Sequence, residues 1–360
     1  MNPYLIFFTF TIGIIFSYYA NDSKKRNLYF IFSLILSLLV AIRSESTPDT
    51  SNYLNFYRSI ECGNLVSLSQ FSFEPGFQLY THFLKLISFG NTSIYLFYIS
   101  ITNTLILWKT FNNIDNNQTN NPTLFLILYY SFFGLFYNAI VIRAGIAISL
   151  VLFTISLQDS TKLNHLKKRT VTLCVLIIAV LFHYSAILSI PIYIIYRYTP
   201  KLSKGTYILL WIIPTTLFAA KISSFIIPNL INIVLNIFDT LSNTNLNKYS
   251  YYITELYDLN SKLPYRLIFQ FAACLLFISV NNATKQYYKF LNIYLCGLFL
   301  SSIFYSIEQL SRITDYFLIF SFILFYMIYE RYLLNKYIII PFISTIYLQL
   351  IFVIRIIKDH

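Results

Sequence analysis

Long uncharged apolar runs recur along the whole chain and are separated by short polar segments. A helix that crosses a bilayer needs about 20 mainly apolar residues. By that criterion the pattern predicts an all-α, polytopic bundle of about twelve transmembrane helices, forming one integral membrane domain over residues 1–360. The expected spans lie near residues 3–20, 27–42, 92–109, 122–137, 139–157, 170–182, 184–198, 206–227, 264–281, 288–306, 312–330 and 337–357.

Lysine and arginine collect in the short loops between these runs. The basic loops are 21–27, 162–169, 197–204, 285–289 and 330–336. Cytoplasmic loops hold the excess of these residues, and all the basic loops fall on one side only if segment 76–90 does not cross the membrane. We therefore expect both termini outside and extracytoplasmic loop regions at 43–91 and 228–263. Long loops of this kind favour binding or catalysis over simple tethering.

The composition supports this assignment and excludes other classes. Hydrophobic residues make up 57% of the chain and charged residues 11%, whereas soluble domains are about a quarter charged. The net charge of +12 is interpreted as an orientation signal and an attraction to anionic lipid. A nucleic-acid partner would need a soluble basic face, and the sequence shows none. The scattered cysteines and the absence of metal-ligand spacing predict neither a disulfide framework nor a metal or cofactor site.

One permanent charge lies within an apolar run, in "NAIVIRAGIAISLVLFTISL". An arginine near the bilayer core costs roughly 2.5 kcal/mol or more by insertion scales and usually faces a bundle interior or a water-filled path. Gly145 and Ser149 follow at the small-xxx-small spacing typical of close helix packing. We interpret the small residues as packing and Arg143 as functional.

Other polar residues collect at the predicted outer ends of the spans. They are Arg43, Asp49, Glu74, His183, Glu308 and Arg312. Three arginines on one membrane face suit a phosphate or pyrophosphate, because a guanidinium binds such oxygens in a fork and keeps its charge. Carboxylates and an imidazole nearby could deprotonate a hydroxyl. The set therefore predicts an outward anion site beside a base.

Each of these residues also has a structural interpretation. Arg43 and Arg312 lie near span ends, where snorkelling to the interface is common, and a single histidine such as His183 is more often structural than catalytic. Glu74, before Pro75-Gly76, is at least a helix start. Asp49 follows a proline and suits a turn.

Five motifs resemble, in order and spacing, the EpsG-like branch of the Wzy-type polysaccharide polymerases. They are "IRSESTPDTSNYLNFY", "FEPGFQLY", "VIRAGIAISLVLF", "LFHYSAILSIPIYI" and "SRITDYFLIF". Ala144 stands where glutamine is often expected. The resemblance implies a bacterial inner- or plasma-membrane glycosyltransferase of the lipid-linked, C-type superfamily. Such an enzyme transfers a growing glycan (O-antigen, capsule or exopolysaccharide) from undecaprenyl pyrophosphate to the non-reducing end of another lipid-linked repeat unit, outside the membrane.

Roles for the outer residues follow from this resemblance. Arg143 and Arg312, with Arg43, would bind the donor pyrophosphate without a required metal. The base would come from His183, Asp49 or Glu74. Glu308 and tyrosines of the outer loops would contact the glycan, although an interfacial aromatic belt accounts for the tyrosines equally well. These tyrosines are Tyr53, Tyr57, Tyr249, Tyr251 and Tyr252. The expected partners are an undecaprenyl-pyrophosphate-linked oligosaccharide, membrane lipid and a chain-length regulator.

Two rival functions stay open. A flippase or transporter of lipid-linked glycans could also hold pyrophosphate with arginines, but it should expose cations to both sides of the membrane, and inverted repeats typical of many transporters are not evident. A membrane glycan ligase or an acyltransferase would make a single transfer product instead of a ladder of lengths.

Overall fold

The computed structural model describes residues 3–47, 49–60, 73–114, 121–160, 164–223, 265–306, 308–332, 343–351 and 354. The regular elements in these ranges are all helices, so the all-α prediction is confirmed. The chain divides into two compact units, one formed by Met1–Tyr193 with Tyr326–His360 and the other by Ile194–Phe325. The prediction of one membrane domain over the whole chain stays a prediction.

Several helices have the length and composition of membrane spans. Within the described ranges, the helices long and apolar enough to cross are Pro122–Ala139, Lys285–Phe304 and Arg312–Glu330. Shorter apolar helices occur at Tyr4–Tyr19, Ile142–Ser156, Lys204–Ala219 and Tyr265–Ser279. These helices indicate a membrane protein, whereas the predicted number of about twelve spans is not confirmed.

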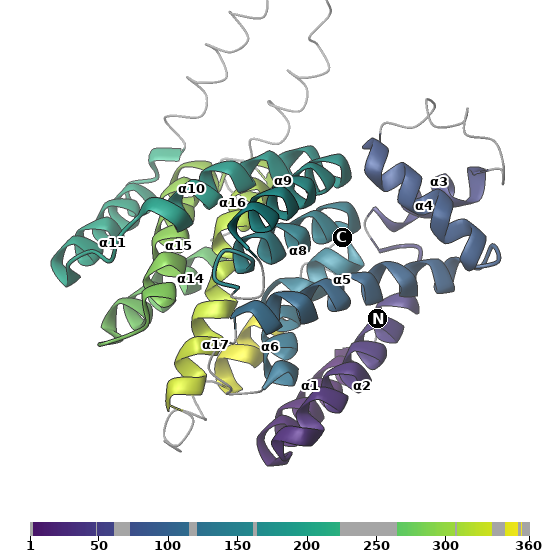
Figure 1. Cartoon of the computed structure of the whole chain (residues 1–360), viewed down its shortest axis with the longest axis horizontal. Helices are drawn as coiled ribbons and strands as arrows, with labels where there is room; N and C mark the ends of the chain where they lie inside the picture. Colours follow the sequence, from purple (N-terminus) through teal and green to yellow (C-terminus); the bar gives the residue numbers. More distant parts are fainter. Residues whose placement is uncertain are drawn as a thin grey trace, which may run out of the picture. The chain divides into compact units, whose positions relative to one another are not determined.

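The first unit is built around α5 and α8. Its helices include α1 (Pro3–Tyr19), α2 (Asp22–Ala41), α3 (Thr50–Ser59), α4 (Pro75–Ile87), α5 (Thr92–Ile114), α6 (Pro122–Tyr129), the π-helix η2 (Tyr130–Gly134), α7 (Leu135–Ala139), α8 (Ile142–Ser156), α9 (His165–Phe182) and the 3-10 helix η3 (Tyr184–Leu188). Helix α5 packs against α2 and α8, and α8 packs against α9 (Figure 1). Helix α4 also contacts α9, so segments far apart in sequence meet near the end of α9.

The turn before α8 lies slightly later than the sequence predicts. We expected it at Asn138, but the helix continues to Ala139 and the next begins at Ile142. Asn138 is buried, donates its side-chain amide to the Gly134 carbonyl at 2.7 Å and accepts a hydrogen bond from Asn103 at 2.8 Å. These bonds satisfy the asparagine inside the bundle, so the helix does not need to end there.

Helix α4 is consistent with the prediction that segment 76–90 does not cross. It has 13 residues, and at about 1.5 Å per residue it is shorter than a bilayer core. Its inner side joins an apolar cluster with α3, α5 and α8. The buried members include Tyr53, Phe56, Phe77, Leu84, Ile99 and Ile146. This packing fixes the start of α4 against the first turn of α8.

The second unit is a smaller helical group. It contains the end of α10 (Ser189–Tyr198), α11 (Lys204–Ala219), α14 (Tyr265–Ser279), α15 (Lys285–Phe304), α16 (Glu308–Leu318) and most of the first half of α17 (Phe320–Tyr332). Helix α15 packs against α11, α14 and α16. A Cβ on Gly297 would lie 2.7 Å from Phe317 Cβ, so glycine permits the close approach of α15 and α16. The predicted outer loop 228–263, with its tyrosines, lies outside the described residues.

Candidate functional site

Glu74 begins α4 at the point where this helix meets α9. It occupies the N-cap position with an extended backbone, and Pro75 follows at the first helical position. Proline suits this position because its fixed φ matches a helix and its missing N–H would be unpaired anyway. A Cβ on Gly76 would lie 2.8 Å from the backbone carbonyl of Leu181. The glycine therefore lets Glu74 come close to the end of α9.

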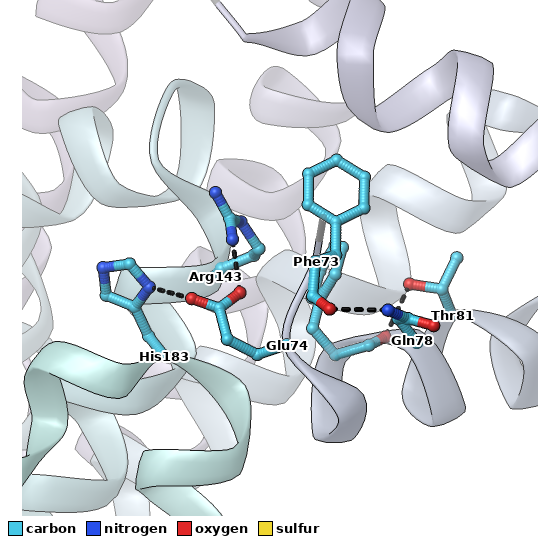
Figure 2. A network of polar contacts seen from close by, with 7 residues as sticks. Phe73, Glu74, Gln78, Thr81, Arg143 and His183 are labelled. Atoms are coloured by element: carbon cyan, nitrogen blue, oxygen red, sulfur yellow. Dashed lines mark hydrogen bonds and ion pairs between the residues drawn. The ribbon is translucent and has the colours of Figure 1, made fainter. Parts of the chain in front are cut away.

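Three of the predicted residues meet at the Glu74 carboxylate (Figure 2). One carboxylate oxygen, Oε2, accepts a hydrogen bond from Nη1 of Arg143 in a salt bridge. The other, Oε1, lies 2.7 Å from Nδ1 of His183. We call Glu74, Arg143 and His183 the carboxylate triad. Its members come from the start of α4, the first turn of α8 and the end of α9.

The end of α9 determines where the His183 ring lies. His183 leaves the helix with extended φ and ψ of −159° and 120°. Its backbone N–H still donates to the Ala179 carbonyl at 3.0 Å, and its carbonyl accepts from Ala186 at 2.9 Å. Backbone bonds on both sides therefore hold the histidine at a sharp change of direction between α9 and η3, where its side chain can reach Glu74.

The environment of Glu74 keeps its carboxylate charged. Its side chain is 5% exposed. Burial alone would raise the pKa of Glu74, but the hydrogen bond with His183 and the positive charge of Arg143 outweigh burial and lower that pKa to about 2. A charged carboxylate only accepts hydrogen bonds, so Nδ1 of His183 must be the donor. In a neutral imidazole, the lone pair then lies on Nε2, which points away from Glu74 (Figure 2).

Two aromatic rings lie beside the Arg143 guanidinium. Its central carbon is 4.8 Å from the Phe73 ring centroid and 5.8 Å from that of Tyr53. A cation over an aromatic face is stabilised by the ring quadrupole. The Nε atom of Arg143 is buried and makes no hydrogen bond with the described residues. Tyr53 also hydrogen-bonds the guanidinium, and the Arg143 side chain is 21% exposed, so a ligand can reach only the outer part of the group.

Arg43 is held by the protein itself. Its Nε donates to Thr50 Oγ1 at 3.0 Å, and Nη1 donates to the Asn138 carbonyl at 2.8 Å. Arg43 is 6% exposed, and its Nη2 is buried without a hydrogen-bond partner in the described part of the chain. The residue ties the end of α2 to the start of α3 and to α7. Its predicted role at a pyrophosphate stays a prediction.

Helix α3 has the predicted residue Asp49 as its N-cap and contains the predicted residues Tyr53 and Tyr57. Asp49 is the N-cap of α3 with a φ of 59°, a left-handed conformation that aspartate tolerates better than most residues. Tyr57 is fully buried, stacks on Tyr95 with ring centroids 4.4 Å apart and hydrogen-bonds Ser88. Tyr53 is also buried. The predicted sugar contacts of Tyr53 and Tyr57 and the predicted role of Asp49 as a base stay predictions.

Arg312 and Glu308 belong to α16 in the second unit. The carboxylate triad lies in the first unit, and the side chain of Glu308 lies outside the described part. Their predicted substrate contacts stay predictions.

Several residues that shape these surroundings were not predicted from the sequence. In the first unit, Phe73 stands beside Arg143 and Gly76 permits the contact with α9. In the second unit, Arg266 pairs with Asp315 at 3.4 Å. The predictions for "FEPGF" concern its carboxylate and the helix start. The contacts of Phe73 with Arg143 and of Gly76 with Leu181 join distant parts of the chain, so the local sequence does not reveal them.

The described residues contain no group of three or more His, Cys, Asp or Glu side chains that could hold a metal ion. What the triad provides is an imidazole held by a charged carboxylate, next to a guanidinium with further donors. That arrangement can accept a proton and bind an anion within one small region.

Comparison with protein-family models gives one assignment. The model of the EpsG family matches residues 26–360, which include every member of the carboxylate triad. No curated protein and no solved structure matches the chain.

Proposed function

The chain belongs to the EpsG family of Wzy-like polysaccharide polymerases, and we propose that it joins lipid-linked glycan repeat units at the carboxylate triad. Family membership gives a glycosyltransferase-like polymerase at a coarse level. One observation carries the assignment of the site: a buried, charged Glu74 holds both Arg143 and His183, which come from separate helices. The donor, the acceptor and the direction of transfer belong to the proposal.

His183 acts as the general base in this proposal. A hydroxyl at the non-reducing end of the acceptor repeat unit attacks the anomeric carbon of the growing glycan and transfers its proton to Nε2 of His183. Glu74 keeps Nδ1 protonated and stabilises the imidazolium that forms. Because its pKa is about 2, Glu74 is a weak base near neutral pH and serves to position the histidine.

Arg143 binds the leaving group. As the anomeric C–O bond breaks, negative charge grows on the departing undecaprenyl pyrophosphate. A guanidinium stays charged and can donate from more than one nitrogen, so Arg143 can hold Glu74 with Nη1 and a phosphate oxygen with its remaining donors. Its position at the edge of a buried cluster lowers the local dielectric and strengthens this interaction.

The location of the reaction follows from the charge pattern. The basic loops define the cytoplasmic side by the positive-inside rule, and the triad lies at the opposite ends of the predicted spans. We propose that transfer occurs on the outer side of a bacterial inner or plasma membrane. The acceptor and donor would both be oligosaccharides on undecaprenyl pyrophosphate.

The direct test uses purified protein in lipid vesicles with lipid-linked repeat units. A polymerase yields a ladder of glycan lengths that remain linked to lipid. Arg143→Ala should abolish the ladder, and Arg143→Lys should shorten it, because lysine keeps the charge and loses the fork. A full-length ladder from a stably folded Arg143→Ala protein would remove this residue from the mechanism.

The same assay separates the rival functions. A flippase moves labelled lipid-linked repeat units across the vesicle membrane without lengthening them. A ligase gives a single transfer product on a different acceptor, and an acyltransferase adds an acyl group to the sugar. Only successive additions of the repeat unit support polymerisation.

A further inference from the structure

Gln78 is a buried glutamine near the start of α4, and the predicted site residues do not include it. The residue is 6% exposed. Its Nε2 donates to the backbone carbonyl of Phe73 at 2.5 Å (Figure 2), and its backbone N–H donates to the carbonyl of Glu74 at 3.0 Å. Gln78 therefore binds the backbone of both residues that precede Pro75.

The two hydrogen bonds make different demands on the residue at position 78. The carbonyl of an N-cap residue accepts the first hydrogen bond of its helix, so the bond to Glu74 would form with almost any residue there. The Phe73 carbonyl lies one residue before the N-cap, outside the helix. A side chain can bind it only if it reaches back along the helix and ends in a donor, as an amide does. The glutamine is therefore tied to Phe73.

Phe73 and Glu74 hold Arg143 from two directions. The ring centroid of Phe73 lies 4.8 Å from the guanidinium carbon, and Glu74 Oε2 accepts a hydrogen bond from Nη1. We call Phe73 and Glu74 the Arg143 clamp. Because the two residues are adjacent in sequence, the position of the ring relative to the carboxylate depends on the backbone between them.

Other contacts of the Phe73 ring leave room for it to shift. The ring packs against Tyr53 with centroids 5.7 Å apart and against Phe56 with centroids 5.1 Å apart. Aromatic pairs tolerate several arrangements, whereas a hydrogen bond depends strongly on distance and angle. The bond from Gln78 therefore sets the backbone position from which Phe73 presents its ring to Arg143.

We infer that Gln78 is a positioning residue that holds the Arg143 clamp, so that the outer part of the guanidinium faces the pyrophosphate of the lipid-linked donor. The identity of this anion rests on the proposed function. Without the side-chain bond the Phe73 ring can move away from Arg143. A misplacement of about 1 Å at a binding group can cost up to about 10²-fold.

The affinity of the full-length protein for undecaprenyl pyrophosphate, measured in vesicles, tests this inference without requiring turnover. Gln78→Leu keeps a similar volume and loses the donor. It should weaken this affinity about tenfold and raise the KM for the lipid-linked donor by a similar factor. The acidic limb of kcat, which reports His183, should stay at the wild-type pH, because the backbone bond to Glu74 is kept.

Gln158→Leu is the matched control. The Gln158 amide donates to Thr172 Oγ1 at 3.1 Å, and Gln158 follows the end of α8 opposite to Arg143. This variant also loses one side-chain amide bond within the first unit. It should lower the thermal midpoint by a comparable amount and leave both the affinity and the donor KM unchanged.

Gln78→Glu tests the hydrogen bond itself. A charged carboxylate only accepts hydrogen bonds, whereas a protonated carboxyl can donate one. The affinity of this variant should be below that of the wild-type protein at pH 8 and should approach it as pH falls toward 5. Glu74 stays charged over this range because its pKa is about 2. Gln78→Leu should show no such recovery, so the recovery excludes misfolding as the cause of the loss.

The outcomes separate the role of Gln78 from the proposed function. Wild-type affinity and donor KM in Gln78→Leu would overturn the positioning role even if the wild-type protein polymerises. Equal losses in Gln158→Leu, or a loss in Gln78→Glu that is the same at pH 8 and pH 5, would also overturn it. A loss of affinity in Gln78→Leu, in a protein that binds undecaprenyl pyrophosphate but forms no glycan ladder, would support the positioning role and contradict the polymerase.

Discussion

At the scale of single residues, the Glu74 carboxylate serves two partners with its two oxygens. Oε2 neutralises Arg143, and Oε1 orients His183. One charge therefore balances the guanidinium and selects the histidine tautomer. Removing that charge leaves Arg143 buried on one side without its counter-ion, which destabilises a protein more than the intact pair stabilises it.

Glu74→Gln should reduce polymerisation by about 10²-fold or more, because an amide can still hydrogen-bond His183 but no longer stabilises the imidazolium. The rate of lipid-linked repeat-unit addition measures this. Glu45→Gln is the matched control, since Glu45 forms an exposed pair with Arg58 and surface pairs contribute little. Equal rates for the Glu74 variant and the control would exclude a role for the carboxylate.

The low pKa of Glu74 also predicts a pH dependence of stability. The carboxylate is favoured in the native state because its pKa is about 2, compared with 4.5 for an ordinary glutamate. Its contribution is complete above about pH 4.5 and is lost as pH falls toward 2, and it amounts to at most about 3 kcal/mol.

Thermal unfolding in detergent between pH 6 and pH 2 measures this contribution. The gap in midpoint between the wild-type protein and Glu74→Gln should be constant down to about pH 4.5 and then narrow. A gap that stays constant through this window would mean that Glu74 has no charged partner in the native protein.

Arg43 and Arg143 should respond differently to substitution by lysine. Arg43→Lys loses one or both of the bonds to Thr50 and Asn138 and should lower stability by about 1–3 kcal/mol through unsatisfied buried groups. Arg143→Lys should affect donor binding and chain length more than stability. Thermal midpoints and glycan ladders measured on both variants check this, and a reversed order would exchange the two roles.

The sequence indicates which residues form the carboxylate triad better than it indicates their contacts with one another. An arginine in an apolar run and a carboxylate before Pro-Gly are visible locally. Their pairing is not, because it joins positions 69 residues apart. The sequence interpretation therefore gave Glu74 and Arg143 separate tasks, as base and anion binder. The full burial of Tyr57 was not predicted either, since periodicity within a ten-residue helix does not reveal it.

At the scale of elements, the close contact of α4 with α9 brings Glu74 to His183. Gly76→Ala would place a methyl group 2.8 Å from the Leu181 carbonyl, which forces the two helices apart. We expect a large loss of polymerisation although no reacting group is changed. Gly205→Ala is the control, since its nearest neighbour for an added Cβ lies 4.0 Å away.

A second substitution tests whether the clash of Gly76→Ala is with the backbone of α9 and not with the Leu181 side chain. Leu181→Ala removes side-chain volume at the same contact, while the clash of Gly76→Ala is with the backbone. Restored activity in Gly76→Ala would require backbone movement of α9, so we expect little rescue by Leu181→Ala in the same ladder assay. Normal activity of Gly76→Ala alone would show that the α4–α9 distance does not control the triad.

The hydrophobic runs predicted the helix positions. The predicted helix ends are wrong where a polar side chain forms hydrogen bonds inside the bundle. The run ending at 137 continues to Ala139 because Asn138 hydrogen-bonds within the helix and to Asn103. The predicted span 184–198 begins as the 3-10 helix η3 before α10. The sequence marked the break at His183 correctly because that residue interrupts an apolar run.

At the scale of the whole molecule, the basic loops predict which side of the membrane each end of the helices faces. In a variant without the native cysteines, Ser46→Cys should react with an impermeant maleimide added to intact cells, and Lys204→Cys should react only after the membrane is opened. Both positions are exposed. The opposite pattern would invert the topology and place the triad on the cytoplasmic side.

The membrane character and the helical class could be predicted from the sequence because both depend on composition and run length. The predicted number of about twelve spans is not confirmed, since only some of the described helices reach the length and hydropathy of a clear span. Short apolar helices such as Ile142–Ser156 can be buried by neighbours, and run length alone does not distinguish that from contact with lipid.

The most direct test of the central claim compares His183→Gln with the wild-type protein in vesicles containing lipid-linked repeat units. The variant should still bind the pyrophosphate-linked donor, since Arg143 and Glu74 are intact, but should add repeat units at least about 10²-fold more slowly. A glycan ladder formed at the wild-type rate by His183→Gln would contradict it.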